Sequence, residues 1–349
     1  MKFSKHMFDW DIVGNEQIVK YLQDSIINNK LSHAYLFLGP SKIGKKELAL
    51  NFSKSILCYN YHLLKNEKKD KYPCNSCIHC FQFDKGIHPD INILAREYNE
   101  KTEKLKQNIS IEQIRDIQEK LNQKAFLNLK KIAIIEEAEA LSEAGSNSLL
   151  KTLEEPKSDT IIILLSAKQD SLLSTIKSRC QIFKMKPVAR EKIYDYLISK
   201  GSLRDLAKEI SSFSLGNLKS AKDSFQNAEA LQKRDETVKK FIKILEGRLY
   251  EKMQIIDELV LGSDKSAIIQ CIDVWQTVLR DLALIKLFLE NDVANIKNIE
   301  KLKEMAQKLD IYKIAFLLDK LNQSKDNIER NVNSNLALEN FALETNFKN

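Results

Sequence analysis

Residues 39–46, GPSKIGKK, have the types and spacing of a phosphate-binding loop. They match the GxxxxGK pattern in full, with Gly39, Gly44 and Lys45 in its defining places. The glycines let backbone N–H groups wrap an anion, and the lysine adds a charge. Lys46 stands where the pattern normally has Ser or Thr, whose hydroxyl ligates Mg²⁺. Because an ammonium group repels that metal, we expect a loop that retains nucleotide affinity without full ATPase chemistry.

Two adjacent carboxylates, Glu136 and Glu137, could hold Mg²⁺ or orient a water molecule. They follow the unbroken apolar run 132–135, which is typical of a strand covered on both faces of a parallel sheet. Ligands of such sheets lie outside the carboxyl ends of the strands, so the pair is well placed. The alternative is a pair of solvated charges at a strand end. The lysine at position 46 leaves both interpretations open.

Four of the six cysteines, Cys58, Cys74, Cys77 and Cys80, fall within one segment. In a reducing cytosol such a cluster predicts a metal site rather than disulfides, and four thiolates suit tetrahedral Zn²⁺ with no open position. The further Cys-Pro of a ferredoxin-type cluster is absent. We therefore expect a structural Zn²⁺ site. A nucleic-acid-binding zinc ribbon is the weaker alternative, because the basic insertion 62–72 lacks interleaved aromatics and is better interpreted as a solvated face.

The elements around these residues follow a strand and helix alternation. Short apolar runs predict strands at 33–38, 90–95, 132–135 and 160–165. Helices are predicted after residue 44, after a capping box at Ser110, and from residue 144. Residues 97–107 are charged and predict an exposed loop. The pattern predicts an α/β domain over 1–186, a parallel sheet with helices on both faces. After Pro187 only helices are expected, in a small unit over 187–227 and a longer one over 228–349.

Composition sets the remaining limits. At 349 residues the chain is long enough for two or three domains, and the scarcity of Gly (9) and Pro (5) favours long helices. The formal charge of +7, from 55 basic and 48 acidic residues, permits nucleic-acid contact without showing it. No apolar run of about 18 residues occurs, so no membrane span is expected. The N-terminus lacks the features of a signal peptide, and a cytoplasmic location is expected.

Several segments together resemble the clamp loaders of bacterial DNA polymerase III, in particular the delta-prime family of their subunits. They are residues 33–50, the CxxCxxC segment followed by His88-Pro89-Asp90, and residues 132–156, 175–181 and 331–343. The resemblance is specific as far as residue 186 and mostly positional from there to residue 330. It implies an AAA+ domain carrying the zinc module, a helical lid and a helical collar. It also implies a five-subunit ring with gamma or tau and delta subunits, which opens the sliding clamp and places it on primed DNA.

Departures from the family's ATPase pattern set the expected role. Lys46 replaces the hydroxyl residue, and Glu136 stands where the family has a metal-binding Asp. Lys168 and Lys219 fall where the motor subunits have a polar sensor residue and a sensor arginine. Four departures imply a stator that does not hydrolyse ATP, with a degenerate nucleotide site. The alternative is an ATP-hydrolysing motor subunit of the gamma or tau kind.

Arg179, in the Ser-Arg-Cys of residues 178–180, is retained from the family pattern. The resemblance implies that this arginine reaches across a subunit interface to the γ-phosphate of ATP bound by a neighbour. A planar, permanently charged guanidinium suits that task, and the alternative is an arginine in a surface salt bridge. Ser178 and Cys180 are expected to fix the turn rather than to react.

Overall fold

The structure is a computed structural model that describes residues 8, 10–59, 72–98, 106–126, 130–157, 159–168 and 170–345. The chain forms two compact units. One unit contains residues 1–189 and 217–219, and the other contains 190–216 and 220–349. The predicted division at residues 186 and 227, with a separate lid between them, stays a prediction.

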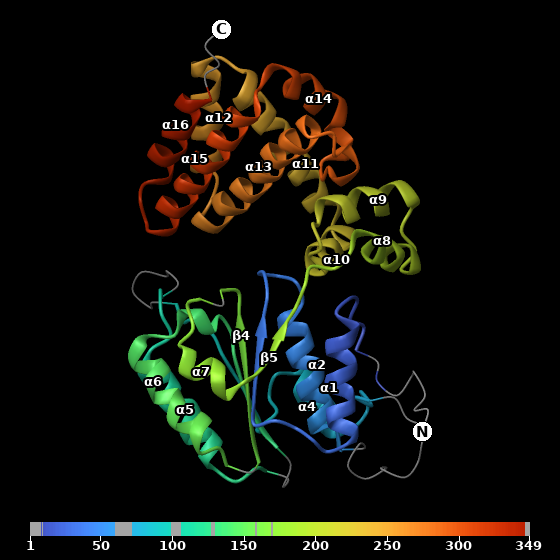
Figure 1. Cartoon of the computed structure of the whole chain (residues 1–349), viewed down its shortest axis with the longest axis vertical. Coiled ribbons are helices and arrows are strands. Elements are labelled where there is room, and N and C mark those ends of the chain that lie inside the picture. The colour runs from blue at the N-terminus through green and yellow to red at the C-terminus, as the bar shows by residue number, and fades with distance from the viewer. Residues whose placement is uncertain are drawn as a thin grey trace. The chain divides into compact units, whose positions relative to one another are not determined.

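The first unit is built on a five-stranded sheet in which all the pairings are parallel (Figure 1). The strand order is β2-β3-β4-β1-β5. The strands are β1 (Ala34–Leu38), β2 (Ile91–Leu94), β3 (Lys131–Ile135), β4 (Thr160–Ser166) and β5 (Gln181–Lys184). Alternate residues of β3 serve opposite faces, since Ile132 and Ile134 enter one hydrophobic core and Ala133 and Ile135 enter another. This explains why the run 132–135 has no polar residue.

Helices cover both faces of this sheet, as predicted (Figure 1). One core includes residues of α1 (Glu16–Ile27), α2 (Lys45–Leu57) and α4 (Ile78–Asp84). The other includes residues of α5 (Ile111–Asn122), α6 (Glu143–Glu154) and α7 (Ser174–Arg179). The expected capping box of α5 is present, between Ser110 and Gln113. A short 3₁₀ helix, η1 (Ala138–Ala140), links β3 to α6.

Strand β5 was not predicted from the sequence. It has four residues and lies at the edge of the sheet beside β1. Its polar ends, Gln181 and Lys184, leave an apolar run of only two residues, Ile182 and Phe183, which is too short to predict a strand. The strand nevertheless matters for the phosphate loop, because the chain continues directly to Met185 beneath Gly39.

The second unit is helical in the part of the chain that the structure describes. Its helices are α8 (Arg190–Ser199), α9 (Arg204–Phe213), α11 (Ala228–Glu246), α12 (Leu249–Leu261), α13 (Lys265–Lys286), η2 (Glu290–Asp292), η3 (Ile296–Asn298), α14 (Ile299–Lys308), α15 (Ile311–Glu329) and α16 (Ser334–Glu344). Helix α10 (Leu218–Gln226) begins in the first unit and continues in the second. Stacked rings of Phe241, Trp275 and Phe341 lie in the core of the second unit. Among the described residues, no helix combines the length and apolarity needed to cross a membrane.

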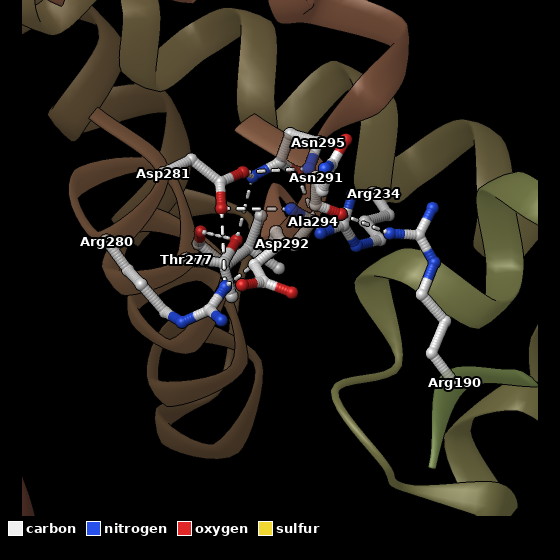
Figure 2. Close-up of polar contacts among 10 residues, drawn as sticks. Arg190, Arg234, Thr277, Arg280, Asp281, Asn291, Asp292, Ala294 and Asn295 are labelled. Carbon is white, nitrogen blue, oxygen red and sulfur yellow. Dashed lines mark hydrogen bonds and ion pairs between the residues drawn. The ribbon is translucent and has the colours of Figure 1, made fainter. Parts of the chain in front are cut away.

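A buried polar network connects α11 and α13 with the turn before α14 (Figure 2), and a ring contact of Arg234 joins α9 to it. Asp281 is fully buried and accepts hydrogen bonds from the backbone N–H groups of Ala294 (2.9 Å) and Asn295 (2.8 Å). Arg234 donates to the Asn295 side chain (2.8 Å), and its guanidinium lies 4.2 Å from the ring centroid of Phe213. Burial raises the pKa of Asp281, although these donors oppose the shift.

Replacing Asp281 by Ala is expected to lower the free energy of unfolding by about 2 to 4 kcal/mol, because two buried N–H groups lose their acceptor. Urea unfolding of the full chain measures this change. Asp292→Ala is the matched control, because the Asp292 side chain is exposed on the neighbouring turn. Equal stability of the two variants would contradict the role assigned to the network.

Candidate nucleotide and metal sites

The glycine loop leaves the end of β1 and leads into the first turn of α2, as the sequence predicted. A Cβ atom on Gly39 would lie 2.6 Å from the carbonyl oxygen of Met185, so only glycine fits beside the chain that leaves β5. Gly44 caps α2 with a φ of 97°, in the left-handed region that favours glycine. The loop therefore places backbone N–H groups at a helix N-terminus, which is the geometry that binds phosphate.

Lys45 is bonded within its own loop. Its Nζ donates to the carbonyl oxygens of Gly39 (2.5 Å) and Pro40 (2.6 Å). Burial lowers the pKa of Lys45, and the nearby Glu139 carboxylate opposes that shift. An incoming phosphate must replace these carbonyl contacts, so part of its attraction to Lys45 is offset.

Lys46 and Glu136 are brought together, which the sequence did not predict. The Lys46 Nζ lies 2.5 Å from the Glu136 Oε1, and the Glu136 side chain is 21% exposed. In a hydrolysing site a hydroxyl and a carboxylate at these positions share a Mg²⁺ ion. Here the ammonium of Lys46 directly neutralises the carboxylate. A divalent cation would have to displace a bonded positive charge to reach Glu136.

Glu137 points to another cation, Arg96, through two hydrogen bonds of 2.6 and 2.9 Å. Its φ of 51° is unusual for a residue other than glycine. Arg96 follows β2, which pairs with β3, so both residues lie at the carboxyl edge of the sheet. Sequence reasoning did not include Arg96, although its place after a predicted strand was a usable signal. Both members of the acidic pair are therefore charge-compensated by the chain itself.

Glu139 is a further acidic residue that the sequence analysis did not single out. Its Oε1 accepts the backbone N–H of Ala167 (3.0 Å), and its Oε2 is buried without a hydrogen-bond partner in the described part of the chain. This carboxylate joins η1 to the end of β4. Of the acidic side chains near the loop, it is the one with an unused buried oxygen.

Lys168 and Lys219, predicted at the two sensor positions, are both exposed. Lys168 follows β4, where its backbone N–H donates to Ser166 Oγ (3.2 Å). Lys219 lies in the first turn of α10. Their assignment to the degenerate nucleotide site stays a prediction.

Arg179 is the last residue of α7, and its guanidinium bonds to its own domain. Nη1 donates to the carbonyl oxygen of Thr175 (3.0 Å), and Nη2 lies 2.6 Å from Oε1 of Glu154 at the end of α6. The Arg179 side chain is 33% exposed, so it remains accessible from solvent. Burial raises the pKa of the adjacent Cys180 thiol to about 12, which fits a structural and unreactive role.

The four predicted cysteines come together at the junction of α2 and α4. All four Sγ atoms lie within 4.8 Å of one another, and Cys74 and Cys80 are 3.9 Å apart. A tetrahedral site with Zn–S bonds of about 2.3 Å has S···S edges of about 3.8 Å. Cys58 and Cys80 are buried and Cys74 and Cys77 are partly buried. The donor set therefore fits a closed four-thiolate Zn²⁺ site.

Backbone N–H groups donate to three of the four sulfurs and favour their thiolate form. Cys74 N donates to Cys58 Sγ (3.4 Å), Cys77 N to Cys74 Sγ (3.4 Å), and Cys80 N to Cys77 Sγ (3.5 Å). Burial acts to raise the pKa of Cys77, yet hydrogen bonds to its sulfur bring this pKa below its ordinary value. The hydrogen bond with the Cys58 thiol, followed by burial, raises the pKa of Cys80. The predicted solvated insertion lies mostly outside the described residues, as does the middle of the loop predicted at 97–107.

A chain of hydrogen bonds joins the cysteine cluster to the sheet. His88 Nδ1 accepts the backbone N–H of Asp90 (3.1 Å), so Nε2 of the same ring carries the proton shared with His79 Nδ1 (3.0 Å). His79 directly precedes Cys80, and both histidines are buried. Asp90 is buried and accepts the backbone N–H of Phe126 (3.0 Å). The cysteine module is thus connected to the start of β2.

Comparison with known proteins identifies relatives of this chain. Residues 14–189, half of the chain, match the family described as DNA polymerase III, delta subunit. The chain is 26% identical over 330 residues to DNA polymerase III subunit delta' of Bacillus subtilis, covering 94% of each protein. It is 38% identical over 149 residues to subunit delta' of Pseudomonas aeruginosa, 43% of this chain and 42% of that protein. It is 36% identical over 183 residues to subunit tau of Bacillus subtilis, 52% of this chain and 30% of that protein.

A solved structure has a similar fold over most of the chain. It is a DNA polymerase III gamma subunit-related protein from Thermotoga maritima, with a TM-score of 0.50 and 19% identity. The likeness covers 94% of this chain and 98% of that one. It confirms the expected fold class, an AAA+ α/β domain followed by helices.

Proposed function

The chain belongs to the DNA polymerase III delta-prime family, and from this premise we propose that it is a stator of the clamp loader. In this role it holds its place in a ring with gamma or tau and delta subunits, in the cytoplasm. The ring opens the sliding clamp and places it on primed DNA. The chain contributes an arginine to a neighbour's ATP site and does not turn over ATP itself.

The observation that carries this proposal is the ion pair between Lys46 and Glu136. Phosphoryl transfer needs Mg²⁺ to bridge the phosphates and to neutralise developing charge. In this chain the ammonium of Lys46 stands where the metal's hydroxyl ligand is expected, and it is paired with the carboxylate of Glu136 at the strand end. Glu137 is likewise bonded to Arg96. We infer that the site can hold a phosphate anion through the loop but cannot organise the metal that hydrolysis requires.

Arg179 supplies the active contribution in this proposal. Its guanidinium is at the end of a short helix, is partly exposed, and has the planar geometry that recognises a phosphate. In a neighbour's site it would stabilise the charge on the γ-phosphoryl group during transfer.

The cysteine module has a structural part in the proposal. Zn²⁺ bound by Cys58, Cys74, Cys77 and Cys80 would fix the short α4 against α2 and would perform no chemistry, because four thiolates leave no open position. ATP at the degenerate loop, with Gly39, Gly44 and Lys45 as its contacts, is a bound ligand at most.

The alternative is a motor subunit of the gamma or tau kind. It is favoured by the intact glycines and Lys45, and by the similarity to a tau subunit. Phosphate release by the isolated chain with ATP and Mg²⁺ separates the two functions. We expect no turnover, and steady hydrolysis that disappears in Lys45→Ala would favour the motor.

Replacing Lys46 by Thr should restore part of the missing metal site. Because Glu136 loses its cation and a hydroxyl takes the place of the ammonium, we expect ATP binding to become Mg²⁺-dependent, by on the order of tenfold in Kd. Calorimetry with and without Mg²⁺ measures this change. Lys42→Asn is the matched control, since it removes a charge from the same loop at an exposed position with a φ of 62°. An equal response of both variants would argue against a specific role of the Lys46 and Glu136 pair.

A further inference from the structure

We propose that Glu154 is a positioning residue for Arg179, holding the guanidinium in the orientation in which it meets a neighbour's γ-phosphate. This inference rests on the proposed trans-acting role of Arg179. Glu154 and Arg179 are the last residues of two helices, α6 and α7, and their side chains meet at 2.6 Å.

Helix stability does not explain a glutamate at this position. The carboxyl end of a helix carries partial negative charge, so a glutamate there is slightly unfavourable. The ion pair is also a weak source of folding stability, because the Arg179 and Glu154 side chains are 33% and 48% exposed. The effect of the pair that remains is on the orientation of the Arg179 guanidinium.

Both terminal nitrogens of Arg179 are restrained. Nη1 donates to the Thr175 carbonyl oxygen (3.0 Å) and lies 3.4 Å from Ser178 Oγ, while Nη2 is paired with Glu154. Nε makes no hydrogen bond to the residues that the structure describes. A guanidinium held at two nitrogens keeps its plane fixed and still offers Nε–H, and a phosphate oxygen can accept from that group.

The helices that carry the two residues are themselves fixed. Leu153, next to Glu154, is 2% exposed, and Ile176 on α7 is fully buried. Gln118 of α5 donates to the Ser148 carbonyl oxygen (2.8 Å) and to Thr152 Oγ1 (2.7 Å), which ties α6 to its neighbour. Glu154 is therefore a restraint mounted on a rigid element, as a precise contact in trans requires.

Glu154→Gln keeps the size of the side chain and removes the charge that holds Nη2. In the reconstituted clamp loader with the sliding clamp and primed DNA, we expect this variant to lower kcat for ATP by about tenfold with little change in KM, because the arginine is less well oriented in the transition state. In an Arg179→Ala background the same substitution should have no further effect. Glu155→Gln, at the adjacent exposed position, is the matched control and should behave as the native chain does.

Three results would overturn the inference. The first is an unchanged kcat in Glu154→Gln. The second is an increased kcat, because the pair would then compete with the phosphate for the arginine. The third is a decrease in kcat that also occurs in the Arg179→Ala background, because the effect would then be structural. The proposed function is tested separately by Arg179→Ala alone. If that variant is fully active, the trans-acting role fails and the inference fails with it. If that variant is impaired while Glu154→Gln is fully active, only the inference fails.

Discussion

A clamp loader that contains Arg179→Ala should assemble normally and hydrolyse ATP about 10³-fold more slowly at the site next to this subunit. Arginines that act in trans on a transferring phosphoryl group contribute on the order of 10³ to 10⁵ in rate. The side chain is partly exposed and its ion pair lies on the surface, so its removal should cost little stability. Clamp- and DNA-stimulated phosphate release by the reconstituted complex measures the effect.

Two control variants make this result specific. Arg179→Lys keeps the charge but loses the planar fork, so it should recover only a small part of the rate. Arg115→Ala removes an exposed arginine from α5 in the same unit and should leave the rate unchanged. In the proposed ring, where gamma or tau subunits bring further ATP sites, single-turnover measurement should show one slow site beside sites of normal rate. A complex of native activity at every site would refute a trans-acting Arg179.

The features that the sequence predicted well depend on local patterns. Residues 132–135 are apolar because they face two cores, and this requirement is visible without knowledge of their partners. The CxxCxxC spacing likewise constrains three thiols to one short turn, and the fourth, Cys58, directly follows α2. In such patterns the spacing along the chain alone fixes the local arrangement, so the parallel fold and the cysteine cluster could be predicted.

The partners of the charged residues could not be predicted in this way. The sequence indicated that Lys46 would repel Mg²⁺, yet it did not indicate that Glu136 would bind its ammonium directly, because that contact depends on how β1 and β3 are placed around β4. The pair between Arg179 and Glu154 depends on the packing of two helices that are separated by a strand. Long charged side chains can choose among several neighbours, and only the assembled fold decides between them.

Replacing Cys80 by Ser should abolish Zn²⁺ binding at the proposed cysteine site and destabilise the first unit. Cys80 is 1% exposed, and its sulfur lies 3.9 Å from that of Cys74. A structural Zn²⁺ site contributes folding free energy directly, and its loss leaves three thiols packed against one another. We expect the zinc content to fall from one per chain to near zero and the Tm to fall by about 10 °C, equivalent to roughly 3 kcal/mol. Elemental analysis and thermal unfolding measure the two effects.

The control for this substitution is Cys180→Ser, which alters a partly buried thiol outside the cluster and should leave the zinc content at one per chain. Iron in the native protein, or no metal in protein purified under reducing conditions, would contradict the assignment. Lowering the pH should release the metal, because protons compete for the thiolates.

The consequences of losing Zn²⁺ should reach the candidate nucleotide site through a continuous set of hydrogen bonds and strand pairings. His79, the residue before Cys80, shares a hydrogen bond with His88. The His88 ring in turn accepts the backbone N–H of Asp90, just before β2. Strand β2 pairs with β3, whose end carries the Glu136 that binds Lys46. Hydrogen exchange in Cys80→Ser should therefore be faster in β2 and β3 and unchanged in the second unit. Faster exchange confined to residues 72–86 would instead mean that the cysteine module folds independently of the sheet.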